Sequence, residues 1–284
     1  GRVAKADLTL TDGVAYIPQL GQDLREGKAK VRAAPARADG KQELRISEVE
    51  AQGTSGRVHG SASALLNGLS LERLSAKLAI DPGQELPITV EGVPLGKASG
   101  EVELEATPFG GDKPSQMAQL GPNKLKEGFD VRARVLRAVF ELPNASSRDV
   151  ISLDDAPGLR IRQPLAPPVE KRAETAWGYA MRLDVESTEI KSQALNLKLG
   201  TAKDSPIEIE LSDRLHTRGD IELSEGSIVL NSKTFELDEG IVQLRDEDTG
   251  NPWVSLTAHW EADDDSRVFV DYRGLLMPIT DDKI

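Results

Sequence analysis

The chain has 284 residues, a formal net charge of -12, 38% hydrophobic and 4% aromatic residues, and no cysteine. A chain of this length can form one long β domain or two ordinary domains. The acidic balance argues against a nucleic-acid partner, which needs a basic patch, and the lack of cysteine excludes disulfides and thiolate metal sites. The sequence contains no apolar run of about 18 residues, the length that a membrane-spanning helix needs.

The first half of the sequence predicts a series of short strands. Leu8 and Leu10 alternate with polar residues, and Asp12-Gly13 predicts a turn after them. Residues 69–80 fit two patterns, because their leucines have helical spacing while apolar residues also recur at every second position from 74 to 80. We favour a strand here, since the neighbouring segments are strands and the segment is short for a helix.

Residues 164–178 interrupt this pattern. Pro164, Pro167 and Pro168 lie close together there, which is typical of a linker or a long insertion. We therefore expect three parts: a first β region over residues 1–163, the proline-rich linker or insertion over 164–178, and a second β region over 179–284.

The clearest strand signal lies in residues 207–272, where apolar and polar residues alternate and Gly, Asp, Asn and Ser separate the runs. One spacing recurs three times, as Gly219 with Ile221 and Leu223, Gly226 with Ile228 and Leu230, and Gly240 with Val242 and Leu244. Stacked units of one sheet produce such a repeat. Together these patterns predict an all-β fold, a long antiparallel β meander of roughly sixteen to twenty short strands.

Catalytic and metal-binding patterns are lacking. The histidines His59, His216 and His259 fall in three separate predicted strands, and no pair of them has metal-ligand spacing. The acidic segments 246–251 and 263–265 lack the ligand spacing of a calcium loop and fit turns between strands. No serine lies in a nucleophile elbow. We expect a protein that is not an enzyme and that binds neither a metal nor a cofactor.

The apolar face of the predicted strands allows two interpretations. It is either the dry inside of a β-sandwich or a groove that stays open to an apolar ligand. The scarcity of aromatic residues favours the groove, because small aliphatic side chains line a channel of even width. Each buried methylene group contributes about 0.8 kcal/mol, so an acyl chain of about 14–16 carbons gains roughly 10 kcal/mol from a continuous apolar trough.

Several degenerate motifs follow one another in a fixed order along the chain. They are Leu8-Thr-Leu-Thr-Asp-Gly-Val-Ala-Tyr-Ile-Pro18, Gly56 with Val58 and Gly60, Val139-Phe-Glu-Leu-Pro143, Gly226 with Ile228 and Leu230, Phe235 with Leu237, Gly240 with Val242 and Leu244, Asn251-Pro-Trp-Val-Ser-Leu-Thr-Ala258, and Val268 with Val270, Tyr272 and Gly274. In this order they resemble the TamB family, a group of AsmA-like proteins that form the inner-membrane subunit of a translocation and assembly module. The resemblance covers most of the chain and is strongest from about residue 207 to Pro278. One difference is Leu244, where the family often has phenylalanine.

The resemblance implies a β-sheet curled into a taco shape with a hydrophobic interior, located in the periplasm of a Gram-negative bacterium. The first β region then corresponds to upstream groove repeats, and the second to the TamB-like C-terminal domain. It also implies a tether to the inner membrane through a segment that precedes Gly1. The implied partners are phospholipid acyl chains, a BamA- or TamA-type outer-membrane barrel and nascent outer-membrane proteins. The family is linked to phospholipid transport between the membranes and to outer-membrane protein assembly.

These considerations define two sets of candidate residues. The set expected to line a lipid groove is Ile207, Ile209, Leu211, Ile221, Leu223, Ile228, Leu230, Phe235, Leu237, Val242, Leu244, Val254, Leu256 and Ala258. The set expected at a partner-binding edge is Val268, Val270 and Tyr272. Two other functions stay open: an assembly module that templates nascent barrel or autotransporter strands by β-augmentation, and a closed β-solenoid stalk without a ligand.

Overall fold

The computed structural model consists of one sixteen-stranded sheet, and the residues that it describes form no helix. The described residues are 5–17, 22–35, 37–90, 93–118, 125–143, 177–202, 205–212, 215–230, 232–245, 251–262 and 266–276. The predicted all-β class is therefore confirmed. Residues 70–80 form a strand, as the alternation predicted, because tertiary pairing with strands on both sides decides between the two patterns.

The strands are longer than the sequence suggested, reaching 17 residues. They are β1 (Ala6–Ile17), β2 (Gln22–Ala33), β3 (Lys41–Gln52), β4 (Arg57–Asn67), β5 (Ser70–Ile80), β6 (Leu86–Val90), β7 (Val93–Phe109), β8 (Glu127–Glu141), β9 (Trp177–Val185), β10 (Thr188–Lys191), β11 (Leu195–Thr201), β12 (Ile207–Leu211), β13 (Leu215–Leu230), β14 (Lys233–Leu244), β15 (Trp253–Glu261) and β16 (Arg267–Leu275).

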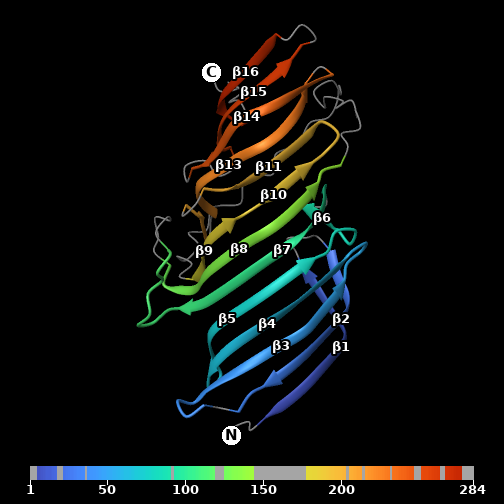
Figure 1. The fold of residues 1–284 in the computed structure, drawn as a ribbon. Helices are drawn as coiled ribbons and strands as arrows, with labels where there is room; N and C mark the ends of the chain where they lie inside the picture. Colours follow the sequence, from blue (N-terminus) through green and yellow to red (C-terminus); the bar gives the residue numbers. More distant parts are fainter. Residues whose placement is uncertain are drawn as a thin grey trace, which may run out of the picture.

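Most strands pair with the strands that precede and follow them, so the sheet rises from β1 at one end to β16 at the other (Figure 1). Some strands depart from this order: β5 pairs with β7 and β11 with β13, and β8 pairs in parallel with both β9 and β10. The predicted antiparallel meander therefore contains one parallel step. Its connection, residues 144–176, lies outside the described residues and includes all of the predicted linker except residues 177 and 178, which open β9. Both predicted β regions contribute to one continuous sheet.

Next to this step the sheet forks into two ribbons. The ribbon of β10 and β11 and the ribbon of β9 and β12 both lie between β8 and β13. Thr201 closes the fork with its side chain, because its Oγ1 accepts a hydrogen bond from the Val185 amide at 3.0 Å and donates one to the Val185 carbonyl at 3.3 Å. At the point where the two ribbons separate, the Thr201 hydroxyl thus satisfies backbone groups of Val185 that a neighbouring strand would otherwise bond.

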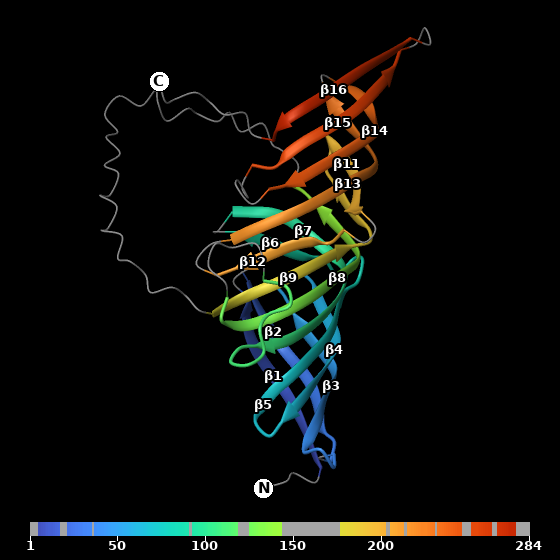
Figure 2. The same ribbon diagram turned by 90° about the vertical axis from the view of Figure 1, so that its left-hand side faces the viewer.

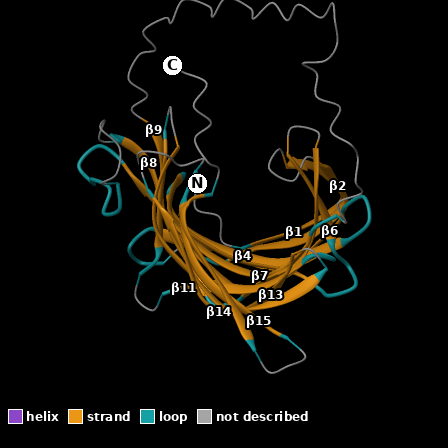
Figure 3. Ribbon diagram, turned by 90° about the horizontal axis from the view of Figure 1, so that it is seen from above, coloured by secondary structure: helices purple, strands orange, loops and turns teal. Residues whose placement is uncertain are grey.

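The sheet curls into a trough. Seen along its long axis, the strands bend into a U whose two arms stand on either side of an open mouth (Figure 3), and a side view shows the same single layer of strands (Figure 2). Thirteen strands follow one another on the main path. At about 4.8 Å per strand spacing, the trough is on the order of 58 Å long.

β-Bulges accompany the curl. β1, β2 and β3 carry residues with positive φ at Asp12 (58°), Glu26 (53°) and Glu48 (52°), each beside a shift in register. An extra residue in one strand bends that strand and increases its twist. The turn predicted at Asp12-Gly13 is therefore wrong: both residues lie inside β1, where the special backbone geometry makes a bulge and not a hairpin.

Close approach at the bend explains one glycine. Gly226 has φ 159°, and a Cβ atom there would lie 2.4 Å from the backbone oxygen of Asn196 on β11. Any larger residue would push β11 and β13 apart, so the recurring glycine of the sequence marks a contact between two strands.

Candidate binding trough

The two faces of the sheet differ in chemistry over its whole length. Residues that are direct partners on neighbouring strands point to the same face, so the register assigns every strand position to one side. Ala64 pairs with Leu44 on one side and Leu74 on the other, and Leu74 pairs in turn with Ala106. The residues between them are polar or charged. We call the two sides the apolar face and the polar face.

The apolar face is continuous across the sheet. One row of direct partners crosses nine strands and includes a single polar side chain, the buried Thr188. Its members are Ile80, Gly100, Ala138, Thr188, Leu199, Leu223, Gly240, Leu256 and Tyr272. Such a row runs along the trough, at right angles to the strands.

The apolar face is the inside of the curl. All buried apolar residues in the strands lie on it, apart from Phe109 and Ala180. Side chains on the concave side of a bent sheet converge, which buries them without a second layer. Many of them are small: Ala62, Ala76 and Ala133 lie in one row with Leu104. Small side chains at the bend let the walls curl while the mouth stays open.

The apolar face is only partly shielded from solvent. On this face Leu8 and Leu10 of β1 are 64% and 50% exposed, and Leu78 of β5 is 45% exposed. No second sheet covers the apolar face within the described residues, which form one open sheet.

All fourteen residues expected to line a groove lie on the apolar face. Ile207, Leu223, Val254 and Ala258 are buried, at 3–8% exposure, while Leu211 and Leu230 at strand ends are 45% and 47% exposed. The other eight are half-buried. Their contact with a ligand remains a prediction.

Two bulges make this common placement possible. Leu223 and Ile228 are five residues apart on β13, so a regular strand would point them to opposite faces. A register shift of β13 against β11 follows Leu223, and a matching shift of β14 against β15 lies beside Asp238. Because both strands carry the extra residue at the same level, their mutual register is unchanged and the apolar side chains stay on one face.

The expected edge residues lie on β16, which among the described strands is the last of the sheet and pairs with β15. Val268, Val270 and Tyr272 are direct partners of Trp260, Ala258 and Leu256, so they extend the apolar face to the edge. Val268 is 45% and Tyr272 39% exposed.

Sequence reasoning confined the candidate residues to positions 207–272, but the trough also includes β1 to β11. The missed signal is the alternation Ser61-Ala62-Ser63-Ala64 and Ser75-Ala76. In these segments the two faces differ by little more than a hydroxyl group, which a search for large aliphatic residues passes over.

The polar face carries ion pairs between strands. Arg32 on β2 lies 2.8 Å from Asp7 on the neighbouring β1, and Lys41 on β3 lies 2.6 Å from Glu72 on β5, across the end of β4. The hydrogen bond from Arg32 lowers the pKa of Asp7, and the hydrogen bond between Lys41 and Glu72 raises the pKa of Lys41 and lowers that of Glu72. Asp7 and Arg32 are exposed and Lys41 and Glu72 are partly buried, so each pair contributes little, but opposite charges on paired strands favour the observed register.

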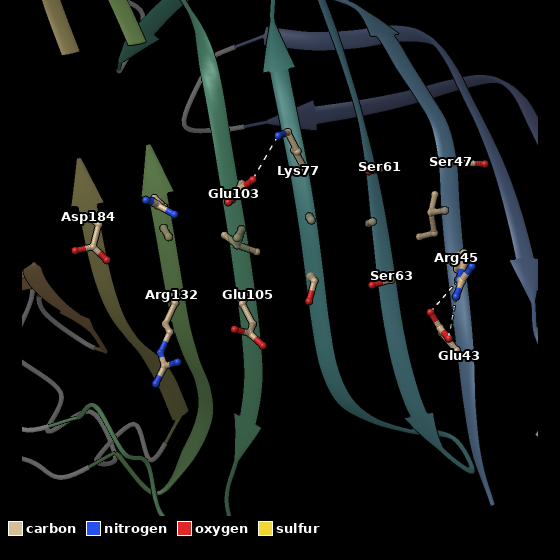
Figure 4. A pocket seen from close by; sticks show the side chains of 17 residues that line it. Glu43, Arg45, Ser47, Ser61, Ser63, Lys77, Glu103, Glu105, Arg132 and Asp184 are labelled. Atoms are coloured by element: carbon tan, nitrogen blue, oxygen red, sulfur yellow. Dashed lines mark hydrogen bonds and ion pairs between the residues drawn. The ribbon is translucent and has the colours of Figure 1, made fainter. Parts of the chain in front are cut away.

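A shallow hollow of about 780 Å³ lies on the polar face across β3 to β9 (Figure 4). Its floor is low because β4 and β5 present the serines Ser61, Ser63 and Ser75. Charged side chains border it, with Lys77 bonded to Glu103 at 3.4 Å. None of these serines has a histidine among the lining residues, so the hollow holds no pair of nucleophile and base.

The three histidines lie apart, as their spacing suggested. His59 Nδ1 is 3.6 Å from Asp81, and His259 Nδ1 is 2.9 Å from Asp238. Within the described ranges no three His, Cys, Asp or Glu side chains could share a metal ion. Residues 246–250 and 263–265, the acidic segments, lie outside these ranges.

Searches of protein-family models, curated proteins and solved structures give no match to this chain. In the part of the chain that the structure describes, no helix is long and apolar enough to cross a membrane.

Proposed function

We propose that the protein is a non-enzymatic carrier surface that shields phospholipid acyl chains in its trough. The apolar face carries this proposal, because it continues across the whole sheet and no layer of the described residues covers it. An extended acyl chain needs a long apolar surface of even depth, and it needs no polar group that positions reacting atoms.

The trough suits a chain that moves along it. Each row offers apolar contacts at intervals of one strand spacing, about 4.8 Å. Each methylene group that leaves water gains about 0.8 kcal/mol, and it gains nearly the same amount at the next strand. A ligand therefore stays shielded while it slides.

From the resemblance to the TamB family we further propose that this activity takes place in the periplasm of a Gram-negative bacterium, between the inner and outer membranes. A trough on the order of 58 Å then forms part of a longer apolar path. The polar face, with its ion pairs, keeps the outside of the sheet hydrated. The lipid, and not a cofactor, is the only ligand in this proposal.

Native mass spectrometry after purification in mild detergent tests the proposal, combined with lipid extraction. We expect phospholipid to co-purify with the chain and to be lost when Leu256 is replaced by Asp. Ser255→Asp, on the opposite face of the same strand, is the matched control and should keep its lipid. A lipid-free protein that also fails to bind a fluorescent fatty acid would refute the proposal.

A second candidate function rests on β16, which ends the sheet in the part of the chain that the structure describes. A strand at the edge of a sheet can accept another strand, and Phe269, 59% exposed, adds apolar surface there. Such an edge suits a nascent barrel strand or the edge of a BamA-type barrel.

Proline substitutions separate the two candidates. Consecutive residues of an edge strand point their N–H groups alternately toward the sheet and away from it, so Phe269→Pro and Val270→Pro are compared. The variant that melts like the wild type has lost an outward N–H. Under β-augmentation this proline variant stops binding to the barrel, while Leu256→Asp still binds. Under lipid carriage the proline variant keeps its phospholipid, while Leu256→Asp loses it.

A further inference from the structure

A cluster of large apolar side chains lies at one rim of the trough. Phe129, Tyr179, Leu211 and Leu215 are direct partners in one row across β8, β9, β12 and β13. Trp177 is the first residue of β9, on the same face as Tyr179. We call these five residues the aromatic lip.

The aromatic lip stands at the end of a trough wall. Leu211 ends β12, Leu215 begins β13, and Phe129 is the third residue of β8. Figure 3 shows the ends of β8 and β9 at the top of one arm of the U, beside the open mouth. Any ligand that enters the trough from that side passes these side chains.

The rings of the aromatic lip pack against one another and still face solvent. The ring centroids of Trp177 and Tyr179 are 4.9 Å apart, and Phe129 lies 6.5 Å from Trp177 and 6.1 Å from Tyr179. Trp177 is 48% exposed and Tyr179 38%, and Leu211 and Leu215 are 45% and 47% exposed. Packing of β8 on β9 accounts for the ring contacts. It does not account for four large apolar side chains left half in water at adjacent positions.

The composition of the aromatic lip selects the kind of partner. Tryptophan and tyrosine combine a large apolar body with a hydrogen-bonding group, and they favour the boundary between lipid headgroups and acyl chains. Beside the rings lies a hollow of about 360 Å³ whose lining includes Lys113, Glu127, Phe129 and Trp177. Lys113 belongs to that lining, so its ammonium group lies beside the rings and can meet a lipid phosphate.

We infer that the aromatic lip docks on the headgroup layer of a phospholipid bilayer. Trp177 and Tyr179 sit at headgroup depth, Leu211 and Leu215 reach the upper acyl chains, and the mouth of the trough faces the membrane. The inference deepens the proposed function, because it names the place where an acyl chain enters. Docking itself does not require that the trough carries lipid, so the two can fail separately.

Fluorescence of a chain with Trp177 as its sole tryptophan tests the docking directly. The variant W253F/W260F is mixed with vesicles of phosphatidylcholine and phosphatidylglycerol, with or without bromine on the upper acyl carbons. We expect a blue shift of the emission and strong quenching by the brominated lipid. The variant W177F/W260F, which keeps only Trp253 on the polar face, is the control and should show neither effect.

Removal of the rings gives the second measurement. The variant W177S/Y179S should reduce co-sedimentation with the same vesicles at least about tenfold, since it removes the larger part of the exposed apolar area. Its far-UV circular dichroism spectrum and its Tm should stay close to those of the wild type, which shows that the sheet is folded. The inference is overturned if Trp177 is not quenched, or if Trp253 is quenched equally. It is also overturned if the serine variant binds vesicles normally while its sedimentation coefficient changes, which would assign the aromatic lip to contact with a second copy.

Discussion

A single carboxylate placed on either side of β5 distinguishes the two faces most sharply. Ala76 and Ser75 are neighbours in sequence and both are half-buried, but they belong to the apolar and the polar face. Ala76→Asp puts the charge between Ala62 and Leu104, its direct partners, in a row without an opposite charge. Ser75→Asp puts the same charge beside Glu105 on the hydrated side.

The expected effect of Ala76→Asp on ligand binding follows from the lost contacts. A hydrated carboxylate prevents about three methylene groups of the acyl chain from contacting the apolar face. Each lost contact costs about 0.8 kcal/mol of binding free energy. Binding should weaken by about 2.4 kcal/mol, or roughly 60-fold. The introduced carboxyl is charged at neutral pH. Because apolar surroundings raise its pKa above that of a free aspartate, it loses this charge already in weak acid.

The assay is a titration with a fatty acid that carries a fluorophore at its methyl end, at neutral pH and near pH 4. At neutral pH Ala76→Asp should bind roughly 60-fold more weakly than the wild type, while Ser75→Asp binds within about twofold of it. The defect of Ala76→Asp should shrink near pH 4, when its carboxyl is neutral. Equal weakening by both variants, with both folded by circular dichroism, would contradict the assignment of the faces.

Three further predictions concern the stability of the sheet. The hydrogen bond with Lys41 lowers the pKa of Glu72, so the pair stabilises the fold above about pH 4.5. This contribution is lost as the pH falls through the lowered pKa of Glu72. Glu72→Gln should therefore reduce Tm at neutral pH and leave it unchanged in strong acid. Gly226→Val should destabilise the chain by about 2–4 kcal/mol in urea unfolding, because its side chain would overlap the neighbouring strand. Thr201→Val leaves the Val185 amide without its hydroxyl partner and should cost about 1–3 kcal/mol, whereas Thr201→Ser should cost much less.

The fold class follows from the sequence because alternation acts locally. Each strand needs only its own apolar face, and residues 207–272 show it plainly. The choice between helix and strand over residues 69–80 also came out correctly, because the adjoining segments supply partners for a strand.

The parallel step and the bulges depend on distant residues. The pairing of β8 with β9 joins positions about fifty residues apart, Glu127 with Trp177, and no local pattern states that register. Asp12-Gly13 has the composition of a turn, and only the pairing with β2 makes it a bulge. For the same reason the aromatic lip escaped sequence analysis: its residues come from four strands that meet only in the folded sheet.

The paired bulges explain how one sheet can be both curled and chemically two-sided. A bulge in β13 alone would bend that strand and would also reverse the faces to which its side chains after Leu223 point. Ile228 would then lie opposite a polar residue of β14. The bulge beside Asp238 removes this conflict. It lies opposite the bulge of β13, so the inward and outward positions of both strands exchange at the same point. Deleting one residue beside Ser224 should therefore do more than flatten the trough. It should expose Ile228 on the polar face and increase the binding of a hydrophobic dye, and a second deletion beside Asp238 should reverse that increase. A double deletion that binds as much dye as the single one would show that the bulges act independently.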